Sequence, residues 1–115
     1  MKTVAVDFSN LDDLSGFGEI ARNYAPRLAQ AALALNDMHF VFIVPERHLE
    51  DFGTHIDYIS REHLKKEARA YAAPIHLWHA THQQFRYRRR RKGTIQLLTV
   101  HDLNYLRRMI QGISI

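Results

Sequence analysis

The sequence predicts an α/β domain of Rossmann-like type, in which helices cover both faces of a five-stranded parallel sheet. Short apolar runs alternate with segments of helical periodicity, and such alternation favours a parallel sheet with right-handed crossovers. The runs at 3–8 and 94–100 show little polar alternation, as expected of strands that are buried on both faces. We expect the strand order 3-2-1-4-5 within a single domain that spans residues 1–115.

The first strand is expected at residues 3–8, and a polar loop with two glycines follows it. A helix should follow over residues 17–35, because apolar residues recur there at spacings of three and four. These residues are Phe17, Ile20, Ala21, Tyr24, Leu28, Ala31, Ala32 and Leu35. Pro26 has no N–H to donate to the carbonyl of Arg22, so we expect a kink or a restart of the helix there.

The second strand is expected at residues 39–44, which are almost entirely apolar. Pro45 suits the first position of a short helix over residues 46–52, and Gly53 suits its end. Residues 55–59 read as a third strand that is half polar. We expect this strand at an edge of the sheet, because central strands of parallel sheets are apolar on both faces.

The second half of the chain repeats the alternation of helix and strand. Ser60 is the expected N-cap of a charged helix that reaches about Ala72. Pro74 disfavours helix in the residue before it, and the fourth strand is expected at 75–79. A long polar loop, 80–93, separates it from the fifth strand. A short helix is expected after that last strand.

Positive charge is concentrated in one segment, residues 86–92, which we call the arginine loop. Its six cations are Arg86, Arg88, Arg89, Arg90, Arg91 and Lys92. Removing them from the net charge of +4 leaves −2 for the rest of the chain. A like-charge block is often a solvated loop, but it can also meet an anionic membrane surface, a phosphorylated acceptor or nucleic acid. Nucleic acid is disfavoured, because Tyr87 is the only aromatic residue within the segment.

Other features of the composition bear on the cellular location of the chain and on its contact with membranes. The chain has no cysteine, which excludes disulfides and thiolate chemistry and agrees with a cytoplasmic location. No apolar run approaches the roughly 20 residues that a membrane-spanning helix needs. Any membrane contact is therefore expected to be peripheral, at the inner face of the membrane and through the arginine loop.

Candidate site residues follow two of the predicted strands. Ser15-Gly16-Phe17-Gly18 is expected in the turn before the first helix, where glycine permits close backbone approach, and the unpaired N–H groups of the helix N-terminus just beyond it attract phosphate. Two glycines at this spacing also occur in plain strand-to-helix turns. His101 and Asp102 follow the last strand. A histidine there can transfer a proton near neutral pH, or it can cap the sheet by bonding a carbonyl.

Three further histidines, His76, His79 and His82, are spaced three residues apart. This spacing suggests a metal site, but an odd separation places His76 and His79 on opposite faces of a strand. No acidic or cysteine ligand stands beside them, so we predict no metal and no bound cofactor. His79 and His82, at the carboxyl end of the fourth strand, are predicted to line a site. His76 is predicted to pack in the core or at an edge.

Four segments occur in the order and spacing of a known family. They are Asp7 with its strand, Ser15-Gly16-Phe17-Gly18-Glu19, residues 77–83, and Leu98-Thr99-Val100-His101-Asp102-Leu103. Together they resemble the N-terminal domain of family-four glycosyltransferases, which have the two-domain GT-B fold. The resemblance covers about residues 1–106. A strand followed by His-Asp-Leu is its most specific part.

The resemblance implies transfer of a sugar from a nucleotide-sugar donor to an acceptor hydroxyl, with retention at the anomeric carbon and without a bound metal. It implies that Gly16, Phe17 and Gly18 face the donor phosphates. His79 and His82 would lie on the acceptor side. The catalytic positions would be His101 and Asp102, where His101 contacts the transferred sugar or stabilises charge on the leaving phosphate.

In that family a C-terminal domain holds the nucleotide sugar. We expect this domain to be missing from the chain, which would then be inactive alone and would depend on the missing half as a partner. The alternative function is a small basic module that binds nucleic acid or an anionic surface through the arginine loop. A third possibility is a scaffold that assembles with a partner through an open sheet edge.

Overall fold

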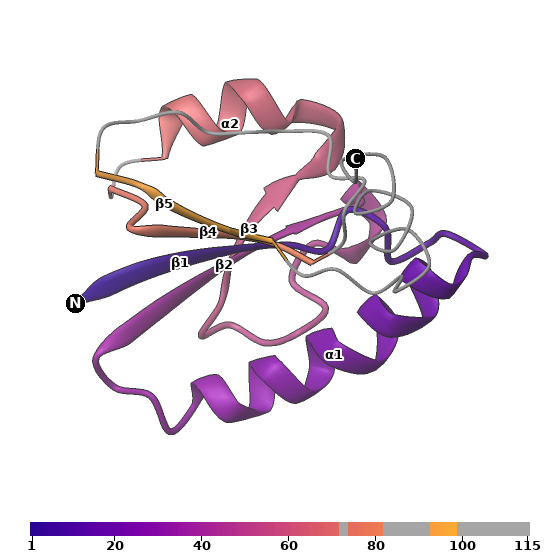
Figure 1. Ribbon diagram of the computed structural model, residues 1–115, viewed down its shortest axis with the longest axis horizontal. Coiled ribbons are helices and arrows are strands. Elements are labelled where there is room, and N and C mark those ends of the chain that lie inside the picture. The colour runs from indigo at the N-terminus through magenta and orange to yellow at the C-terminus, as the bar shows by residue number, and fades with distance from the viewer. Residues whose placement is uncertain (72–73, 82–92, 99–115) are drawn as a thin grey trace, which may run out of the picture.

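A computed structural model describes residues 1–71, 74–81 and 93–98 of the chain. Five parallel strands form one sheet in the order β3-β2-β1-β4-β5 (Figure 1). The strands are β1 (Lys2–Asp7), β2 (Met38–Val44), β3 (Asp57–Ser60), β4 (Leu77–Ala80) and β5 (Ile95–Leu98). The predicted α/β class, the all-parallel sheet and the predicted strand order are therefore confirmed.

Two helices cover opposite faces of the sheet, α1 (Gly16–Ala32) on one face and α2 (Leu64–Ala70) on the other (Figure 1). Two short 3-10 helices, η1 (Glu46–His48) and η2 (Arg61–His63), complete the connections of the described chain. The chain therefore leaves β1 toward one face and returns to β4 from the other face.

The core has two halves, because successive side chains of a strand point to opposite faces of the sheet. On the α1 side Val6, Phe8 and Phe42 pack together with the alanines of α1. On the α2 side the core includes Ile43 and Trp78. The central strands are buried on both faces, which explains their continuous apolar sequences.

Helix α1 is continuous from Gly16 to Ala32, so of the predicted kink or restart at Pro26 the restart is wrong. Pro26 lies on the exposed side of the helix, where water can bond the carbonyl that proline leaves without a donor. The predicted apolar stripe is right only in part. Ile20 and Leu35 are exposed, whereas the sheet is met by Ala21, Ala25, Ala29 and Ala32.

The connections differ from the prediction more than the strands do. The short helix expected over 46–52 is a single 3-10 turn, and the helix expected from Ser60 to Ala72 divides into η2 and α2. Ser60 does not cap a helix with its side chain, because its hydroxyl donates to Glu62 Oε2 at 3.1 Å. The expected edge position of the third strand is confirmed. The short helix expected after Asp102 lies outside the described residues.

Neither of the helices in the described ranges combines the length and the apolar character that crossing a bilayer requires.

Candidate functional site

The connections of the sheet diverge between β1 and β4. These strands are neighbours, with Asp7 beside Ala80 at their carboxyl ends, but α1 follows β1 on one face and α2 precedes β4 on the other. Ligands of open α/β sheets bind in the crevice outside the strand ends where neighbouring connections diverge. The residues from Asp7 to Asn10 and the end of β4 are therefore the candidate site.

Hydrogen bonds at the strand ends fix the floor of this site. Asp7 is 1% exposed, and its Oδ1 accepts the N–H of Ser9 at 2.9 Å. The hydroxyl of Thr81, which is also buried, donates to the backbone carbonyl of Asp7 at 2.6 Å. The carboxylate therefore shapes the turn after β1, and Thr81 ties the end of β4 to β1.

Asn10 has an unsatisfied polar atom in this region. The residue is 4% exposed, and its Oδ1 has no hydrogen-bond partner among the described residues. An unmade hydrogen bond of a buried acceptor costs about 1–3 kcal/mol, so such an atom suggests a donor from a ligand or from water. Sequence reasoning did not single out Asn10, because no periodic pattern indicates that a loop asparagine is buried.

The predicted glycine turn lies at the beginning of α1. Ser15 is the N-cap residue, but its side chain makes no capping hydrogen bond. Gly16 is exposed, and a Cβ added to it would meet no atom within 4 Å from other parts of the described chain. Gly18 is buried, and its missing Cβ makes room for the carbonyl of Asp13. The two glycines therefore differ, since loop backbone occupies the space beside Gly18 whereas the space beside Gly16 is open.

Arg22 holds the loop that precedes α1 in place. Its Nη1 donates to the carbonyls of Leu11 and Asp13, at 2.7 Å each. Phe17, the residue between the two glycines, is half-buried. Gly16, Phe17 and Gly18 lie in the first turn of α1 and not in a loop before the helix as predicted, because α1 begins at Gly16. Their contact with donor phosphates stays a prediction.

His79 lies in β4 beside Val6 and is half-buried. Its ring stands edge-on to the ring of Tyr24, with the centroids 6.2 Å apart, and burial raises the pKa of the Tyr24 hydroxyl. His79 thus contacts α1, while its predicted role toward an acceptor stays a prediction. His76 lies just before β4, and its Nδ1 accepts the N–H of Thr3 at 3.0 Å. This bond links His76 to the beginning of β1, which gives the side chain a structural role.

Several predicted site residues lie outside the described residues. They are His82, His101, Asp102 and the arginine loop, with Arg86, Arg88, Arg89, Arg90, Arg91 and Lys92. Their roles remain predictions from the sequence. Within the described ranges, no group of three or more histidine, aspartate or glutamate side chains is placed to hold a metal ion.

Sequence reasoning missed an ionic cluster that joins the loop after β1 to η1. Asp12 accepts from Arg47 Nε at 2.8 Å and from Arg47 Nη2, and it contacts His48 Nε2 at 2.6 Å. The other ring nitrogen of His48 lies 2.9 Å from Asp51 Oδ2. The hydrogen bonds of Arg47 hold the pKa of Asp12 well below its usual range. No sequence pattern connects these residues, because Asp12 and Arg47 are 35 positions apart.

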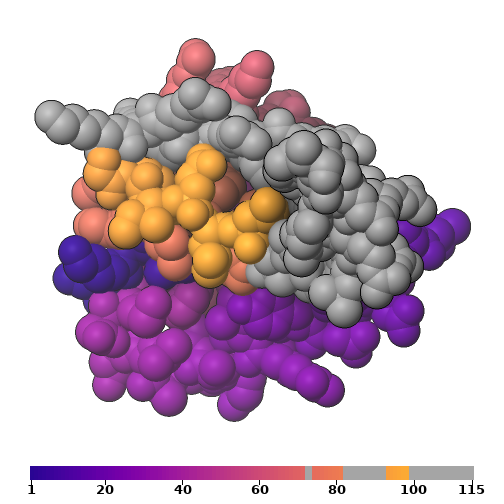
Figure 2. Space-filling view, in the orientation of Figure 1, coloured from indigo at the N-terminus to yellow at the C-terminus, as the bar shows by residue number. Residues whose placement is uncertain are grey.

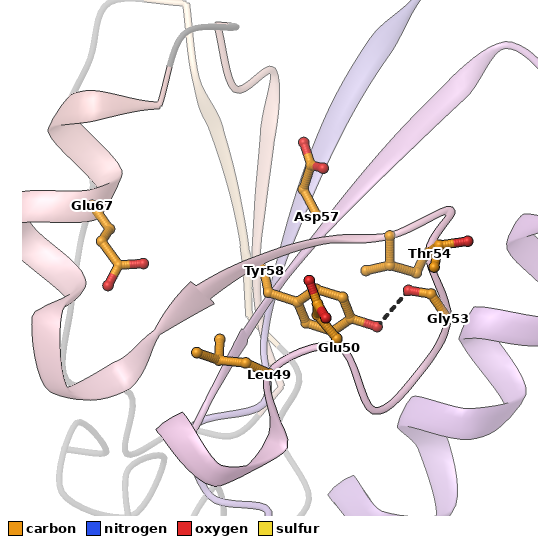
Figure 3. A pocket seen from close by; sticks show the side chains of 8 residues that line it. Leu49, Glu50, Gly53, Thr54, Asp57, Tyr58 and Glu67 are labelled. Carbon is orange, nitrogen blue, oxygen red and sulfur yellow. Dashed lines mark hydrogen bonds between the residues drawn. The ribbon is translucent and has the colours of Figure 1, made fainter.

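A groove of about 590 Å³ runs beside β3, two strands away from β1 (Figure 3). Its lining residues are Leu49, Glu50, Gly53, Thr54, Ile56, Asp57, Tyr58 and Glu67. The Tyr58 hydroxyl donates to the carbonyl of Gly53 at 2.8 Å. Asp57 accepts from the Tyr71 hydroxyl at 2.7 Å and contacts His39 at 2.8 Å. These polar groups therefore support the edge of the sheet.

Comparisons with protein-family models, with curated proteins and with solved structures found no match to this chain. The geometry nevertheless defines a class, because an all-parallel sheet in this order with helices on both faces is a Rossmann-like α/β fold. Fold alone does not establish function, so the functional argument depends on the crevice between β1 and β4.

Proposed function

We propose that this chain is the acceptor-side domain of a glycosyltransferase, which moves a sugar from a nucleotide-sugar donor to an acceptor hydroxyl. The observation that carries the proposal is the position of α1. This helix follows β1 in the chain, and the connections of β1 and β4 diverge at the carboxyl ends of these strands, which is where open α/β sheets bind ligands.

The beginning of α1 supports binding of the donor diphosphate. The first N–H groups of a helix have no partners within the helix and attract anions. The side chain of Ser15 caps none of them, and no other part of the chain that the structure describes fills the space at Gly16. A phosphate group can therefore approach the backbone at Gly16 without displacing a side chain.

Asn10 supports binding of a hydroxyl-bearing ligand in the same crevice. Its buried Oδ1, which lacks a partner in the described chain, accepts hydrogen bonds only. A sugar hydroxyl is the donor that a glycosyltransferase site supplies. We assign Asn10 to this contact. His82 follows β4 by two residues in sequence and His101 follows β5 by three, and the roles proposed for both are those that the family resemblance implies.

Sugar transfer in this proposal needs a second domain that encloses the bound substrates from the other side. One domain cannot exclude water from a transferred sugar or hold both substrates in reacting geometry, so we expect the 115-residue chain alone to show no transfer. The arginine loop would attract an acceptor that carries phosphate or is anchored in an anionic membrane. The nucleotide sugar is a substrate of the complete enzyme, and no metal or other cofactor is invoked.

The test combines donor binding with transfer. A panel of UDP-, GDP- and ADP-sugars is titrated against the chain, first alone and then with a donor-binding domain of a GT-B enzyme supplied. Gly16→Val should weaken binding of the preferred donor at least about tenfold, because its side chain occupies the phosphate approach. Leu14→Val is the matched control, since Leu14 is fully exposed in the loop just before α1.

Loss of a catalytic group is measured in the reconstituted enzyme. His101→Ala should lower kcat about 10²-fold or more if His101 moves a proton or stabilises charge. No binding of any nucleotide sugar under either condition would contradict the proposal. Equal donor affinity of the wild-type and Gly16→Val chains would remove α1 from the site.

A further inference from the structure

Arg61, the first residue of η2, bonds the backbone of the candidate site. Its Nη1 donates to the carbonyl of Ser9 at 2.9 Å, although the two residues are 52 positions apart. Because β2 lies between β1 and β3 in the sheet, this bond connects the segments that follow two non-adjacent strands. Ser9 is buried, and buried carbonyls need a hydrogen-bond donor. The guanidinium of Arg61 supplies that donor.

The carbonyl that Arg61 bonds belongs to the peptide group between Ser9 and Asn10. A peptide group is planar, so the direction of this carbonyl fixes the plane that contains the Cα of Asn10. The neighbouring peptide groups are held as well. The N–H of Ser9 donates to Asp7 Oδ1 at 2.9 Å, and the carbonyl of Asn10 accepts the N–H of Asp13 at 3.0 Å. The backbone on both sides of Asn10 is therefore fixed.

Arg61 is itself held in place by Glu62. Its Nε and Nη2 donate to Glu62 Oε1 at 3.1 and 2.8 Å. Oε2 of the same carboxylate accepts the N–H of Glu46 at 2.9 Å and the hydroxyl of Ser60 at 3.1 Å. The planar fork of arginine can bond a carbonyl and a carboxylate at the same time, whereas a lysine ammonium lacks this geometry. The guanidinium is therefore oriented toward Ser9 before any ligand binds.

A second arginine holds the loop on the other side of Asn10. Arg22 bonds the carbonyls of Leu11 and Asp13, whereas Arg61 bonds the carbonyl that precedes Asn10. Between these anchors Asn10 is 4% exposed, and its Oδ1 has no partner in the described chain. A buried acceptor on a fixed backbone cannot move toward another donor. It therefore discriminates between a ligand that supplies a donor and one that does not.

We propose that Arg61 is a positioning residue for sugar selectivity, which holds Asn10 where its Oδ1 accepts a hydroxyl of the sugar that the nucleotide carries. Arg61 acts through the peptide group between Ser9 and Asn10 and does not contact the ligand in this role. The inference rests on the proposed function, because that function assigns a sugar hydroxyl to Asn10. It adds that recognition of this hydroxyl depends on the segment after β3.

The test measures a selectivity ratio, defined as the dissociation constant of a monodeoxy analogue divided by that of the parent nucleotide sugar. Isothermal titration calorimetry gives both constants for the preferred donor of the panel. Parent and analogue carry the same charge, so loss of a nearby cation weakens both alike. In the wild-type chain the ratio should reach about tenfold or more for at least one analogue, which leaves Asn10 unpaired. Asn10→Ala should bring this ratio to about 1, because it removes the acceptor.

Two variants of Arg61 test its role. Arg61→Ala should lower the selectivity ratio below about threefold, because the backbone before Asn10 is then free to turn. Arg61→Lys keeps the charge without the fork, and its ratio should lie between those of the wild-type and Arg61→Ala chains. This milder variant also provides the measurement if Arg61→Ala does not fold.

Arg27→Ala is the matched control, because it removes the same charge from an exposed position of α1. Figure 2 shows this helix, in purple, at the molecular surface. The selectivity ratio of Arg27→Ala should equal that of the wild-type chain.

Amide hydrogen exchange tests the positioning without a ligand. The N–H groups of Ser9 and Asp13 are bonded within the turn that Arg61 holds. They should exchange at least about fivefold faster in Arg61→Ala than in the wild-type chain, because the turn opens locally. The amide of Val41, in the central strand β2, should be unaffected.

Each contrary result has a defined meaning. Unchanged exchange at Ser9 and Asp13 in both Arg61 variants would overturn the positioning role. A selectivity ratio that stays at its wild-type value in Arg61→Ala, or that falls equally in Arg27→Ala, would overturn the role in selectivity. If no nucleotide sugar binds the wild-type chain, the proposed function fails and the role toward a sugar fails with it. Faster exchange in Arg61→Ala would then still show that Arg61 holds the turn.

Discussion

Replacement of Gly18 by alanine should destabilise the fold, although alanine is the better helix former. The added Cβ would overlap the carbonyl oxygen of Asp13 and lie 2.8 Å from Nη1 of Arg22. Forcing extra atoms into a packed site costs about 1–3 kcal/mol. Displacing the loop also weakens the bonds of Arg22 to Leu11 and Asp13. The gain in helix propensity is at most about 1 kcal/mol. We therefore expect a net loss of about 1–3 kcal/mol in the free energy of unfolding.

Gly16→Ala is the matched control, because it makes the same chemical change two residues earlier in the same helix. Its added Cβ meets nothing within 4 Å, so its free energy of unfolding should stay within about 0.5 kcal/mol of wild type or rise slightly. Urea unfolding followed by circular dichroism measures both variants. If Gly18→Ala were as stable as Gly16→Ala, the close approach of the loop to α1 would not be a feature of the protein in solution.

Three further predictions concern other parts of the molecule. Thr81→Val removes the buried donor to the carbonyl of Asp7 and should cost about 1–3 kcal/mol in urea unfolding, whereas Thr54→Val, at an exposed position, should change little. Asp12 has a folded-state pKa below its unfolded value of 3.8, so its contribution is complete above that value and is lost as the pH falls through the folded pKa. The stability difference between wild type and Asp12→Asn should therefore be constant above about pH 5 and shrink below about pH 4, and a difference that grows in acid would contradict the ion cluster. If the arginine loop binds duplex DNA through six contacts, log affinity should fall with log salt at a slope on the order of −5, and a flat response excludes this mode.

The central strands could be predicted from the sequence because burial on both faces leaves a direct mark on it. The predicted burial of the strand at 94–100 is wrong, because β5 lies at an edge of the sheet and all four of its residues are exposed. Continuous apolar runs at β1 and β2 identify central strands, and the half-polar β3 identifies an edge. The order of the strands then follows from the alternation with helices and from the rules of crossover connections. These features depend on neighbours in sequence, so a single sequence contains them.

The packing of α1 could not be predicted as well. Periodicity favoured the large side chains of Ile20 and Leu35, yet both are exposed and small alanines such as Ala25 and Ala29 meet the sheet. How closely a helix approaches a sheet is decided by the side chains on both sides of the contact, here including Phe8 and Phe42. Periodicity within one segment does not contain that information.

The position of the candidate site follows from the strand order by a general rule for open α/β sheets and stays a prediction. The contacts within it could not be predicted from the sequence. The bond between Thr81 and Asp7 and the clamp between Asp12 and Arg47 join residues 74 and 35 positions apart. Such contacts follow from the completed fold, and no spacing in the sequence indicates them.

Gly16 and Gly18, the two glycines of the predicted phosphate turn, have different surroundings in the structure. A Gly-x-Gly pair is a weak motif for phosphate binding, partly because packing alone can require glycine. Packing requires glycine at Gly18, because the carbonyl of Asp13 occupies the space that a Cβ would take. Packing does not require glycine at Gly16, where the space is open. Alanine there would favour the helix and cost nothing in contacts. Under the proposed function, an exposed glycine at the start of α1 allows a ligand to approach the backbone closely. Binding of a diphosphate at Gly16 is the approach that the proposed reaction supplies.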